Sequence, residues 1–183
     1  MTQAKDTDEN KTISAYCVFC RTGSEHLAAR DINQGYSDLM AIAPLKKLPE
    51  KRQGQWTTRE LILLPGYIFI FSEGELPHDL RHKTNHLYKI LQYERGIRKL
   101  TGSDADYAMW IYRHQGQITS SHVLLVGETI QVIDGPLLDC QGKIVKLDRH
   151  KRRAWVEFEF DGQKRIVSIG AECLNSGGPE GPD

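Results

Sequence analysis

The sequence lacks long apolar runs, and no stretch reaches the roughly 18 consecutive apolar residues of a membrane-spanning helix. Its first residues, MTQAKDTDENKT, are polar and contain no apolar segment, which argues against a secretory signal. We therefore expect a cytoplasmic protein that does not enter a membrane. An excess of charge is also absent, because 24 lysines and arginines balance 24 aspartates and glutamates. Any recognition of phosphate must then come from a local patch.

The motifs of common enzyme active sites are missing as well. The chain contains no P-loop, no nucleophile elbow and no glycine-rich dinucleotide motif. Three histidines, His78, His82 and His86, follow an i, i+4, i+8 spacing that could place their imidazoles on one helix face. No acidic or cysteine partner accompanies them, so a surface stripe is the better interpretation. We predict no enzyme activity, no cofactor and no metal.

Cysteine is scarce, with four residues in the whole chain. Cys17 and Cys20 have the C-x-x-C spacing of redox and zinc sites. The surrounding run AYCVFC is typical of a strand, however, and positions three apart on a strand point to opposite faces. Redox pairs of this kind usually lie at a helix N-terminus, where the dipole lowers the thiol pKa. We therefore interpret both as buried core cysteines.

Residues 13–117 have the pattern of one α+β domain, preceded by a tail, residues 1–12, that we expect to be disordered. The predicted strands cover residues 13–21, 38–43, 61–64, 67–71 and 88–93, and the predicted helices cover about 24–32, 78–86 and a segment that begins at Ser103. KKLPEKRQGQW predicts a basic, hairpin-like loop. The runs 61–64 and 67–71 are apolar at every position, so this part of the sheet must be covered on both faces.

A change of pattern follows residue 117. Residues 118–124, which overlap the polar stretch GQITSSH, predict a linker between domains that move independently. Residues 125–174 contain only short strands, ETIQVI, GKIVKLD, RRAWVEFEF and KRIVSI, separated by glycine-containing turns. This pattern predicts a small β-barrel. The tail SGGPEGPD, residues 175–183, is expected to be disordered.

Two segments resemble one known family. LLPGYIFIF, after the opening AYCVFCRTGSE, resembles the N-terminal NGN domain of NusG-type transcription elongation factors. The C-terminal segment resembles their KOW domain, whose signature matches Val132-Ile133-Asp134-Gly135-Pro136 followed by Gly142-Lys143-Ile144-Val145. Together the two segments cover roughly residues 13–174. The basic turn DRHKRRA further resembles the specialised LoaP paralogues, which are associated with long biosynthetic operons.

The resemblance implies an α+β fold in which an antiparallel-sheet α/β sandwich (NGN) is linked to a small SH3-like β-barrel (KOW). It implies a monomer that binds the clamp helices of RNA polymerase and performs no chemistry of its own. A LoaP-like member is a processive antiterminator that recognises a hairpin in the nascent leader RNA. A housekeeping member instead binds Rho or a small-subunit ribosomal protein through its KOW domain. A translation-side RNA-binding protein is a more distant alternative.

The candidate contact with polymerase lies on the aromatic strand. Alternation along a strand places Tyr67, Phe69 and Phe71 on one face, and Ile68 and Ile70 on the other. An apolar face left uncovered would form a protein-binding surface. The predicted polymerase-binding residues are Tyr16, Leu64, Pro65, Tyr67 and Phe69. The alternative is that these residues are simply part of the core.

The candidate contact with RNA is the basic turn. Four fixed positive charges this close together repel one another unless an anion is present, and arginine forks match phosphate oxygens. We expect Trp155 to point outward beside the arginines, where it could stack on a base or cover the barrel. The predicted RNA-binding residues are Lys143, Lys146, Arg149, His150, Lys151, Arg152, Arg153, Trp155 and Arg165. A solvated loop is the alternative.

Overall fold

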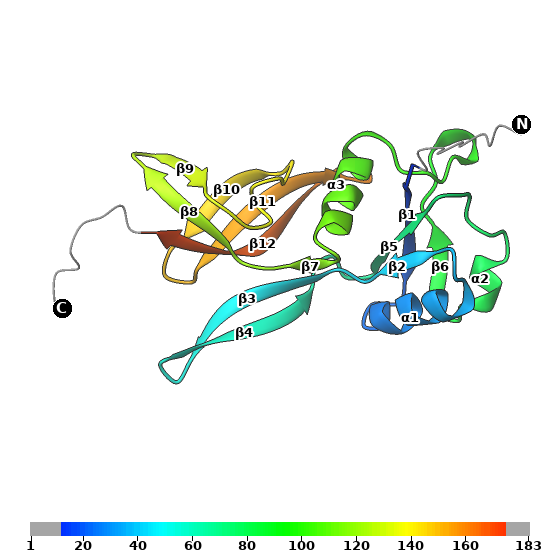
Figure 1. Cartoon of the computed structure of the whole chain (residues 1–183), viewed down its shortest axis with the longest axis horizontal. Helices are drawn as coiled ribbons and strands as arrows, with labels where there is room; N and C mark the ends of the chain where they lie inside the picture. Colours follow the sequence, from blue (N-terminus) through cyan, green and yellow to red (C-terminus); the bar gives the residue numbers. More distant parts are fainter. Residues whose placement is uncertain (1–11, 175–183) are drawn as a thin grey trace, which may run out of the picture.

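The computed structural model describes residues 12–174, which form two domains around three sheets (Figure 1). The helical elements are α1 (Glu25–Gly35), α2 (Leu80–Lys83), the 3-10 turn η1 (Glu94–Gly96) and α3 (Gly102–Arg113). The strands are β1 (Ser14–Cys20), β2 (Met40–Ile42), β3 (Leu45–Arg52), β4 (Gln55–Ile62), β5 (Tyr67–Ser72), β6 (Leu87–Ile90), β7 (Gln117–Ile118), β8 (Ser121–Val126), β9 (Thr129–Val132), β10 (Lys143–Asp148), β11 (Arg153–Phe160) and β12 (Gln163–Leu174). The predicted disordered tails lie outside the described residues, except for Thr12.

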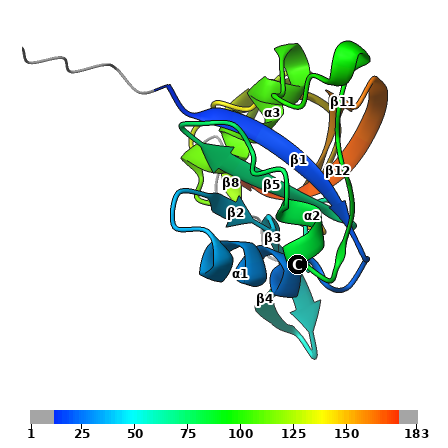
Figure 2. The same cartoon turned by 90° about the vertical axis from the view of Figure 1, so that its right-hand side faces the viewer.

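The N-terminal domain is built on a four-stranded antiparallel sheet in the order β2-β5-β1-β6. Helix α1 covers one face, and α3 lies on the other (Figure 2). As predicted, Ile68 and Ile70 pack on the face beneath α1, whereas Phe69 and Phe71 pack on the opposite face with α3. Because α1 and α3 lie on opposite sides, the all-apolar strand β5 is buried on both faces.

The predicted helix 78–86 is much shorter in the structure. Helix α2 covers only Leu80–Lys83, and Thr84 then adopts an extended backbone with φ of −123°. Of the three regularly spaced histidines, only His82 lies in the helix, so they do not share a helical face. Among residues 12–174, no group of three or more His, Cys, Asp or Glu side chains is placed to hold a metal ion.

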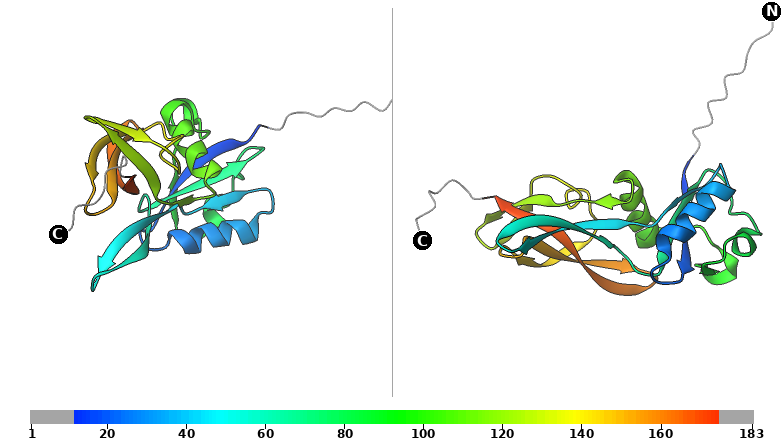
Figure 3. Two further views of the ribbon diagram at one scale, coloured as in Figure 1. Left: turned by 60° about the vertical axis from the view of Figure 1, so that its left-hand side comes forward. Right: turned by 90° about the horizontal axis from the view of Figure 1, so that it is seen from below.

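The basic segment KKLPEKRQGQW forms a regular hairpin rather than a loop. Strands β3 and β4 pair from Leu45–Ile62 to Arg52–Gln55. The two turn residues, Gln53 and Gly54, have φ values of +48° and +82°, a left-handed pair whose twist matches that of the strands. The hairpin extends from the N-terminal domain alongside β12 of the C-terminal domain (Figure 3).

Residues 118–124 do not form the predicted linker. Ile118 ends β7, which pairs in parallel with β3, and Ser121 begins β8, which pairs in parallel with β12. Both side chains are fully buried. The Ser121 hydroxyl accepts a hydrogen bond from the backbone N–H of Leu137 at 2.9 Å, which satisfies a polar group inside the core. These two strands were not predicted because the stretch GQITSSH is polar.

The C-terminal domain is a five-stranded, bent sheet in the order β10-β11-β12-β8-β9 (Figure 1). As predicted for β11, Ala154, Val156, Phe158 and Phe160 are buried, while Arg153, Trp155 and Glu157 alternate with them on the more exposed side. No helix among the described residues is long and apolar enough to cross a membrane.

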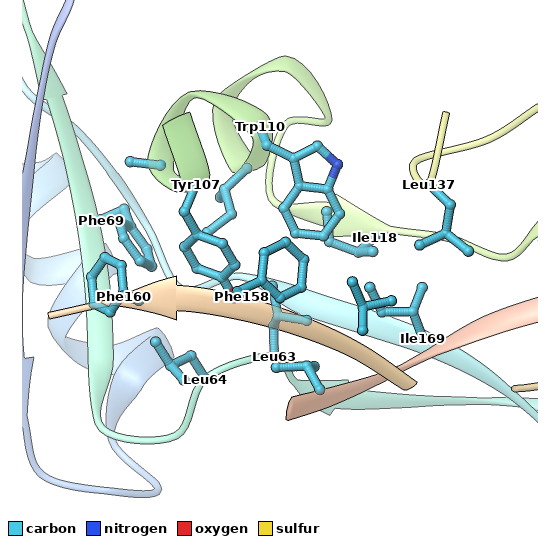
Figure 4. Packing of buried hydrophobic residues seen from close by; sticks show 14 of the residues in the cluster. Leu63, Leu64, Phe69, Tyr107, Trp110, Ile118, Leu137, Phe158, Phe160 and Ile169 are labelled. Atoms are coloured by element: carbon cyan, nitrogen blue, oxygen red, sulfur yellow. The ribbon is translucent and has the colours of Figure 1, made fainter. Parts of the chain in front are cut away.

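The two domains share one apolar core and do not lie apart. Phe158 and Phe160 of β11 pack against Tyr107 and Trp110 of α3 and against Phe69 of β5 (Figure 4). The expectation of independent domains therefore does not hold for this arrangement, which we call the closed arrangement.

Candidate interaction surfaces

The predicted polymerase surface lies at the junction between the domains. We call it the inner face, defined by Leu64, Tyr67 and Phe69. Phe69 is fully buried, and its ring centroid lies 5.5 Å from that of Phe160 in the C-terminal domain. Tyr67 is half-buried at the margin, with its ring 5.9 Å from that of Phe160. The C-terminal domain thus covers the inner face.

The other two predicted polymerase residues lie elsewhere. Pro65 is exposed in the turn before β5. Tyr16 is the register partner of Ile70 and packs beneath α1 on the opposite face, where its hydroxyl donates to the Gly74 carbonyl at 3.0 Å. Tyr16 therefore lies on the opposite face of the sheet from Phe69, because paired residues on adjacent strands share a face, and its contact with polymerase stays a prediction.

Polar contacts add to the apolar junction. Arg165 donates from Nη2 to the Tyr67 hydroxyl at 2.8 Å, and its guanidinium lies 5.1 Å from the centre of the tyrosine ring. The Trp110 Nε1–H donates to the Pro136 carbonyl at 2.7 Å. Both hydrogen bonds cross the junction. Because hydrogen bonds are directional, they fix the orientation of the two domains more closely than apolar contacts alone.

Asp139 forms a further polar link across the junction. Its two carboxylate oxygens contact Arg113 Nε at the end of α3 and Nε2 of the next residue, His114, each at 2.7 Å. Burial raises the pKa of Asp139, but the hydrogen bonds and charges of His114 and Arg113 outweigh that effect and hold the pKa below its ordinary value. The charged form of Asp139 therefore favours the closed arrangement.

Three buried polar atoms at or near the junction have no hydrogen-bond partner within residues 12–174: the Tyr107 hydroxyl, Arg153 Nε and Arg165 Nε. Burial also raises the pKa of Tyr107. An unpaired buried polar atom destabilises its surroundings by about 1–3 kcal/mol. The junction is consequently weaker than its apolar contacts alone indicate.

A buried carboxylate fixes the Pro65-Gly66 turn that leads into β5. Glu25, in the first turn of α1, is 2% exposed. Its two oxygens accept hydrogen bonds from the backbone N–H groups of Gly66 and Gly23, each at 2.8 Å. Gly66 has a φ of +83°, which favours glycine. Glu25 falls within the predicted helix over about residues 24–32, and no sequence pattern indicated its contact with Gly66.

The basic turn connects β10 to β11 and divides into two parts. Arg149, His150 and Lys151 are exposed at its tip, and Asp148 Oδ1 holds the turn by accepting from the Lys151 N–H at 2.9 Å. None of these three side chains forms an ion pair with a described residue. We call them the tip cluster.

The remaining arginines of the predicted patch turn toward the N-terminal domain. Arg152 pairs with Glu172 at 3.3 Å and lies 4.2 Å from the centre of the Trp56 ring on the β3–β4 hairpin. Arg153 has a buried Nε and lies near Lys46, whose pKa is lowered by burial and by the arginine charge. With Arg165 bound to Tyr67, the predicted RNA patch is not one continuous surface in the closed arrangement.

The outer side of β11 carries the other predicted RNA residues. Trp155 is half-exposed, and Lys146 Nζ lies 4.9 Å from its ring centre. Lys143 lies opposite Glu157 in the strand register. Stacking of Trp155 on a base stays a prediction. Lys146 already lies against the same ring.

The two closely spaced cysteines lie on opposite faces of β1, as predicted. Cys17 packs in the core at the domain junction, and Cys20 packs in the core beneath α1. Burial raises the pKa of Cys17 well above its ordinary value, with Asp161 adding to the shift, and burial raises the pKa of Cys20 to about 11. Both thiols are free and unsuited to joint metal binding.

Two sequence relatives of this chain share one description. No family model matches the sequence. The protein described as transcription termination/antitermination protein NusG from Pseudomonas aeruginosa is 24% identical over 133 residues, covering 70% of this chain and 74% of the relative. The protein of the same description from Xylella fastidiosa is 23% identical over 173 residues, covering 86% and 92%.

A solved structure described as "Domain interaction in Thermotoga maritima NusG" shares the fold. It has a TM-score of 0.50 and 16% sequence identity, and the match covers 87% of this chain and 94% of the other. The fold and the two motifs define a protein with an N-terminal α/β sandwich and a β-rich KOW-like domain. The chain is thus similar in sequence and in fold to NusG proteins, as the resemblance predicted.

Proposed function

We propose that the chain is a bacterial, cytoplasmic transcription factor that acts as a processive antiterminator. It binds RNA polymerase through the inner face and a hairpin in the nascent leader RNA through the C-terminal domain. Transcription termination and antitermination are named for both sequence relatives, and proteins of this kind are not enzymes. The observation that carries the RNA contact is the exposed tip cluster, Arg149, His150 and Lys151, which has no carboxylate partner in the described part of the chain.

Binding to polymerase requires the domains to separate, because Phe69 is fully buried by the closed arrangement. Two features support a reversible junction. Asp139 and Arg113, which form one of its ion pairs, are partly exposed, and such pairs contribute only about 0–1 kcal/mol. The unpaired polar atoms of Tyr107, Arg153 and Arg165 also weaken it.

Separation also changes the RNA-binding surface. In the closed arrangement Arg152 lies against the Trp56 ring, Arg165 binds Tyr67, and Arg153 lies near Lys46. When the domains separate, these arginines can join the tip cluster and bind phosphates. RNA and polymerase then both favour the separated state, so each raises the affinity for the other by thermodynamic linkage.

The RNA contact is tested with the full chain, by measuring the affinity for structured leader-RNA hairpins across a salt series. The tip variant combines Arg149→Gln, His150→Gln and Lys151→Gln. Each lost phosphate contact lowers the slope of log affinity against log salt by roughly 0.7–0.9. The control variant, Arg30→Gln with Lys164→Gln, removes the same number of fixed charges from exposed residues that have carboxylate partners. Equal affinities for the tip and control variants would refute RNA binding by the turn.

The polymerase contact is tested separately by measuring binding of the full chain to purified polymerase. Tyr67→Ser removes an aromatic side chain from the margin of the inner face and should weaken binding by roughly tenfold or more. Tyr16→Phe is the control, since Tyr16 lies on the opposite face of the same sheet. If both variants bind like the parent chain, the inner face is not the docking surface.

A second candidate function is a general NusG-like factor whose C-terminal domain binds Rho or a small-subunit ribosomal protein. It is favoured by exposed apolar residues on that domain, since Ile166 is 59% exposed and Val145 is 45% exposed. Ile166→Ser should abolish capture of such a protein without changing RNA affinity. If the tip variant loses RNA affinity and still captures the partner protein, the result favours the antiterminator.

A further inference from the structure

The β3–β4 hairpin lies against the outer side of the C-terminal sheet and forms a second contact between the domains (Figure 3). Gly170 of β12 packs directly beneath it, because a Cβ at this position would lie 3.0 Å from the Lys47 carbonyl oxygen of β3. Beside it, Lys46 Nζ donates to the Ser168 hydroxyl of β12 at 3.3 Å. Arg153 of β11 is opposite Gly170 in the strand register, so its side chain shares this face. We call Lys46, Ser168 and Arg153 the seam.

The seam brings two positive charges together without a counter-charge. Neither Lys46 nor Arg153 forms an ion pair with a carboxylate of residues 12–174. Asp148 lies opposite Arg153 in the strand register, but its Oδ1 accepts from the Lys151 N–H in the turn. Arg153 Nε is buried without a hydrogen-bond partner in the described part of the chain. Burial, together with the arginine charge, lowers the pKa of Lys46. A bound anion would relieve the repulsion and satisfy the unpaired nitrogen.

An aromatic ring lies beside these charges. Lys146, Trp155 and Ser168 form one row across β10, β11 and β12 in the strand register. The indole is therefore next to the hydroxyl that Lys46 contacts. Trp155 is half-exposed, and the exposed Lys146 places its Nζ 4.9 Å from the ring centre. The outer side of the sheet thus offers an accessible ring, with a lysine on one neighbouring strand and the seam on the other.

These features suit a small ligand better than a nucleic-acid strand. A strand gains its affinity from a line of phosphate contacts, whereas the seam provides two cations that converge beneath one hairpin. A nucleoside triphosphate concentrates several negative charges in one group, and its base can stack on an aromatic side chain. The Lys146 side chain can rotate away from the ring to admit the base. We propose that the seam binds the phosphates of a purine nucleoside triphosphate in the closed arrangement, with the purine stacked on Trp155.

Such a ligand would hold the domains together, because Lys46 belongs to one domain and Arg153 to the other. Separation of the domains divides the site, so a ligand that needs both residues binds only the closed arrangement. The nucleotide therefore opposes exposure of the inner face. By linkage, polymerase and the nucleotide should each weaken binding of the other. This last step rests on the proposed function, whereas the binding itself does not.

Isothermal titration calorimetry of the full chain tests the binding. The ligands are ATP and GTP, with adenosine and inorganic triphosphate as the two halves of a nucleotide. The seam variant combines Lys46→Gln and Arg153→Gln. The matched control combines Lys47→Gln and Arg59→Gln, which removes two charges of the same hairpin that have glutamate partners. Circular dichroism confirms that each variant folds.

The seam variant should lose affinity for the nucleotide by roughly tenfold or more, while the control should change by less than about twofold. Adenosine should not bind, and inorganic triphosphate should bind about tenfold more weakly than the nucleotide because stacking is lost. Equal affinities of the seam and control variants would overturn the site. Equal affinities for the nucleotides and inorganic triphosphate would mean an adventitious polyphosphate only, and would refute the proposal.

A second variant keeps the test decisive if the seam variant does not fold. Trp155→Leu leaves both cations in place at a half-exposed position. It should bind inorganic triphosphate like the parent chain, and bind ATP or GTP no more tightly than triphosphate. Unchanged nucleotide affinity in this variant would exclude stacking on Trp155 and so contradict the proposed site.

The effect on the domains is measured at Cys17, which is buried at the domain junction. With nucleotide at about ten times its Kd, alkylation of Cys17 should slow by about tenfold, because the ligand binds only the closed arrangement. An unchanged rate would show that the site does not require closure.

The tip variant separates this result from the proposed function, and should bind the nucleotide like the parent chain. If the chain binds nucleotide but the tip variant keeps its full affinity for leader hairpins, the seam is upheld and the RNA contact is refuted. The reverse pattern refutes the seam alone.

Discussion

The two faces of the N-terminal sheet are both buried, but by different kinds of cover. On one face, Ile68 and Ile70 pack beneath α1, which follows β1 closely in the chain. On the other, Phe69 packs against Phe160 of a separate domain, and unpaired polar atoms lie nearby. A cover that belongs to the same domain leaves only when that domain unfolds. A cover supplied by a second domain can leave while both stay folded, so equal burial does not mean equal permanence.

The largest expected effect lies on the face beneath α1. Ile68→Ala should lower the free energy of unfolding by about 2–5 kcal/mol, because it leaves a cavity in a fully buried core. Ile166→Ala makes the same chemical change at a residue that is 59% exposed, and should stay within roughly 0.5 kcal/mol of the parent chain. Urea denaturation followed by circular dichroism measures both. Similar losses in the two variants would contradict the assignment of Ile68 to a permanent core.

The two β1 cysteines compare the faces directly. Under native conditions Cys17, at the domain junction, should be alkylated about tenfold faster than Cys20, beneath α1, if separation is easier than unfolding by roughly 1.4 kcal/mol. Because burial raises both thiol pKa values, the reaction is run at mildly alkaline pH. Peptide mass spectrometry assigns each product, since Cys140 and Cys173 are also free. Equal rates would mean that the junction opens only with global unfolding.

A smaller effect should follow from removing one polar link across the junction. Asp139→Asn weakens the contacts with Arg113 and His114, and should raise the alkylation rate of Cys17 by about 3–5-fold without changing that of Cys20. Asp134→Asn is the matched control, since Asp134 pairs with His122 inside the C-terminal domain. An equal response to both substitutions would show that Asp139 does not hold the domains together.

The smallest effect concerns pH. The pKa of Asp139 is lowered in the closed arrangement from its ordinary value of 3.8. The ionised carboxylate therefore stabilises the closed arrangement more than the protonated acid does. Its contribution is fully present above that ordinary pKa and is lost as the pH falls through the lowered value. Domain separation, followed by fluorescence energy transfer between labels on the two domains, should increase in this range. The increase should be smaller in Asp139→Asn, and an unchanged pH response in that variant would exclude Asp139 as the titrating group.

Local patterns predicted much of the fold. Alternation along β5 and β11 assigned Phe69, Ile70, Val156 and Phe160 to the correct sides, because side-chain direction follows directly from strand geometry. The two motifs, in their order along the chain, predicted the similarity to NusG proteins. The face on which Tyr16 lies could not be predicted, because it depends on the register between β1 and β5, which composition does not reveal.

The candidate site was predicted less completely, for a physical reason. The sequence identified Arg149–Arg153 as one basic group, but the packing of two domains separates its members. Arg152 contacts Trp56, a residue on a hairpin nearly a hundred positions earlier, and no local pattern indicates that contact. Ser121 was predicted to lie in a linker because it is polar. In the structure its hydroxyl is buried and accepts a hydrogen bond from the Leu137 N–H, a contact that the local sequence does not indicate.

The buried carboxylate of Glu25 has a consequence for the entropy of association. By accepting hydrogen bonds from the N–H groups of Gly23 and Gly66, it joins the turn before β5 to the first turn of α1. The backbone that presents Tyr67 is therefore already ordered before any partner arrives, whether the domains are together or apart. Binding need not order that strand, so little conformational freedom remains to be lost there and more of the contact energy appears as affinity.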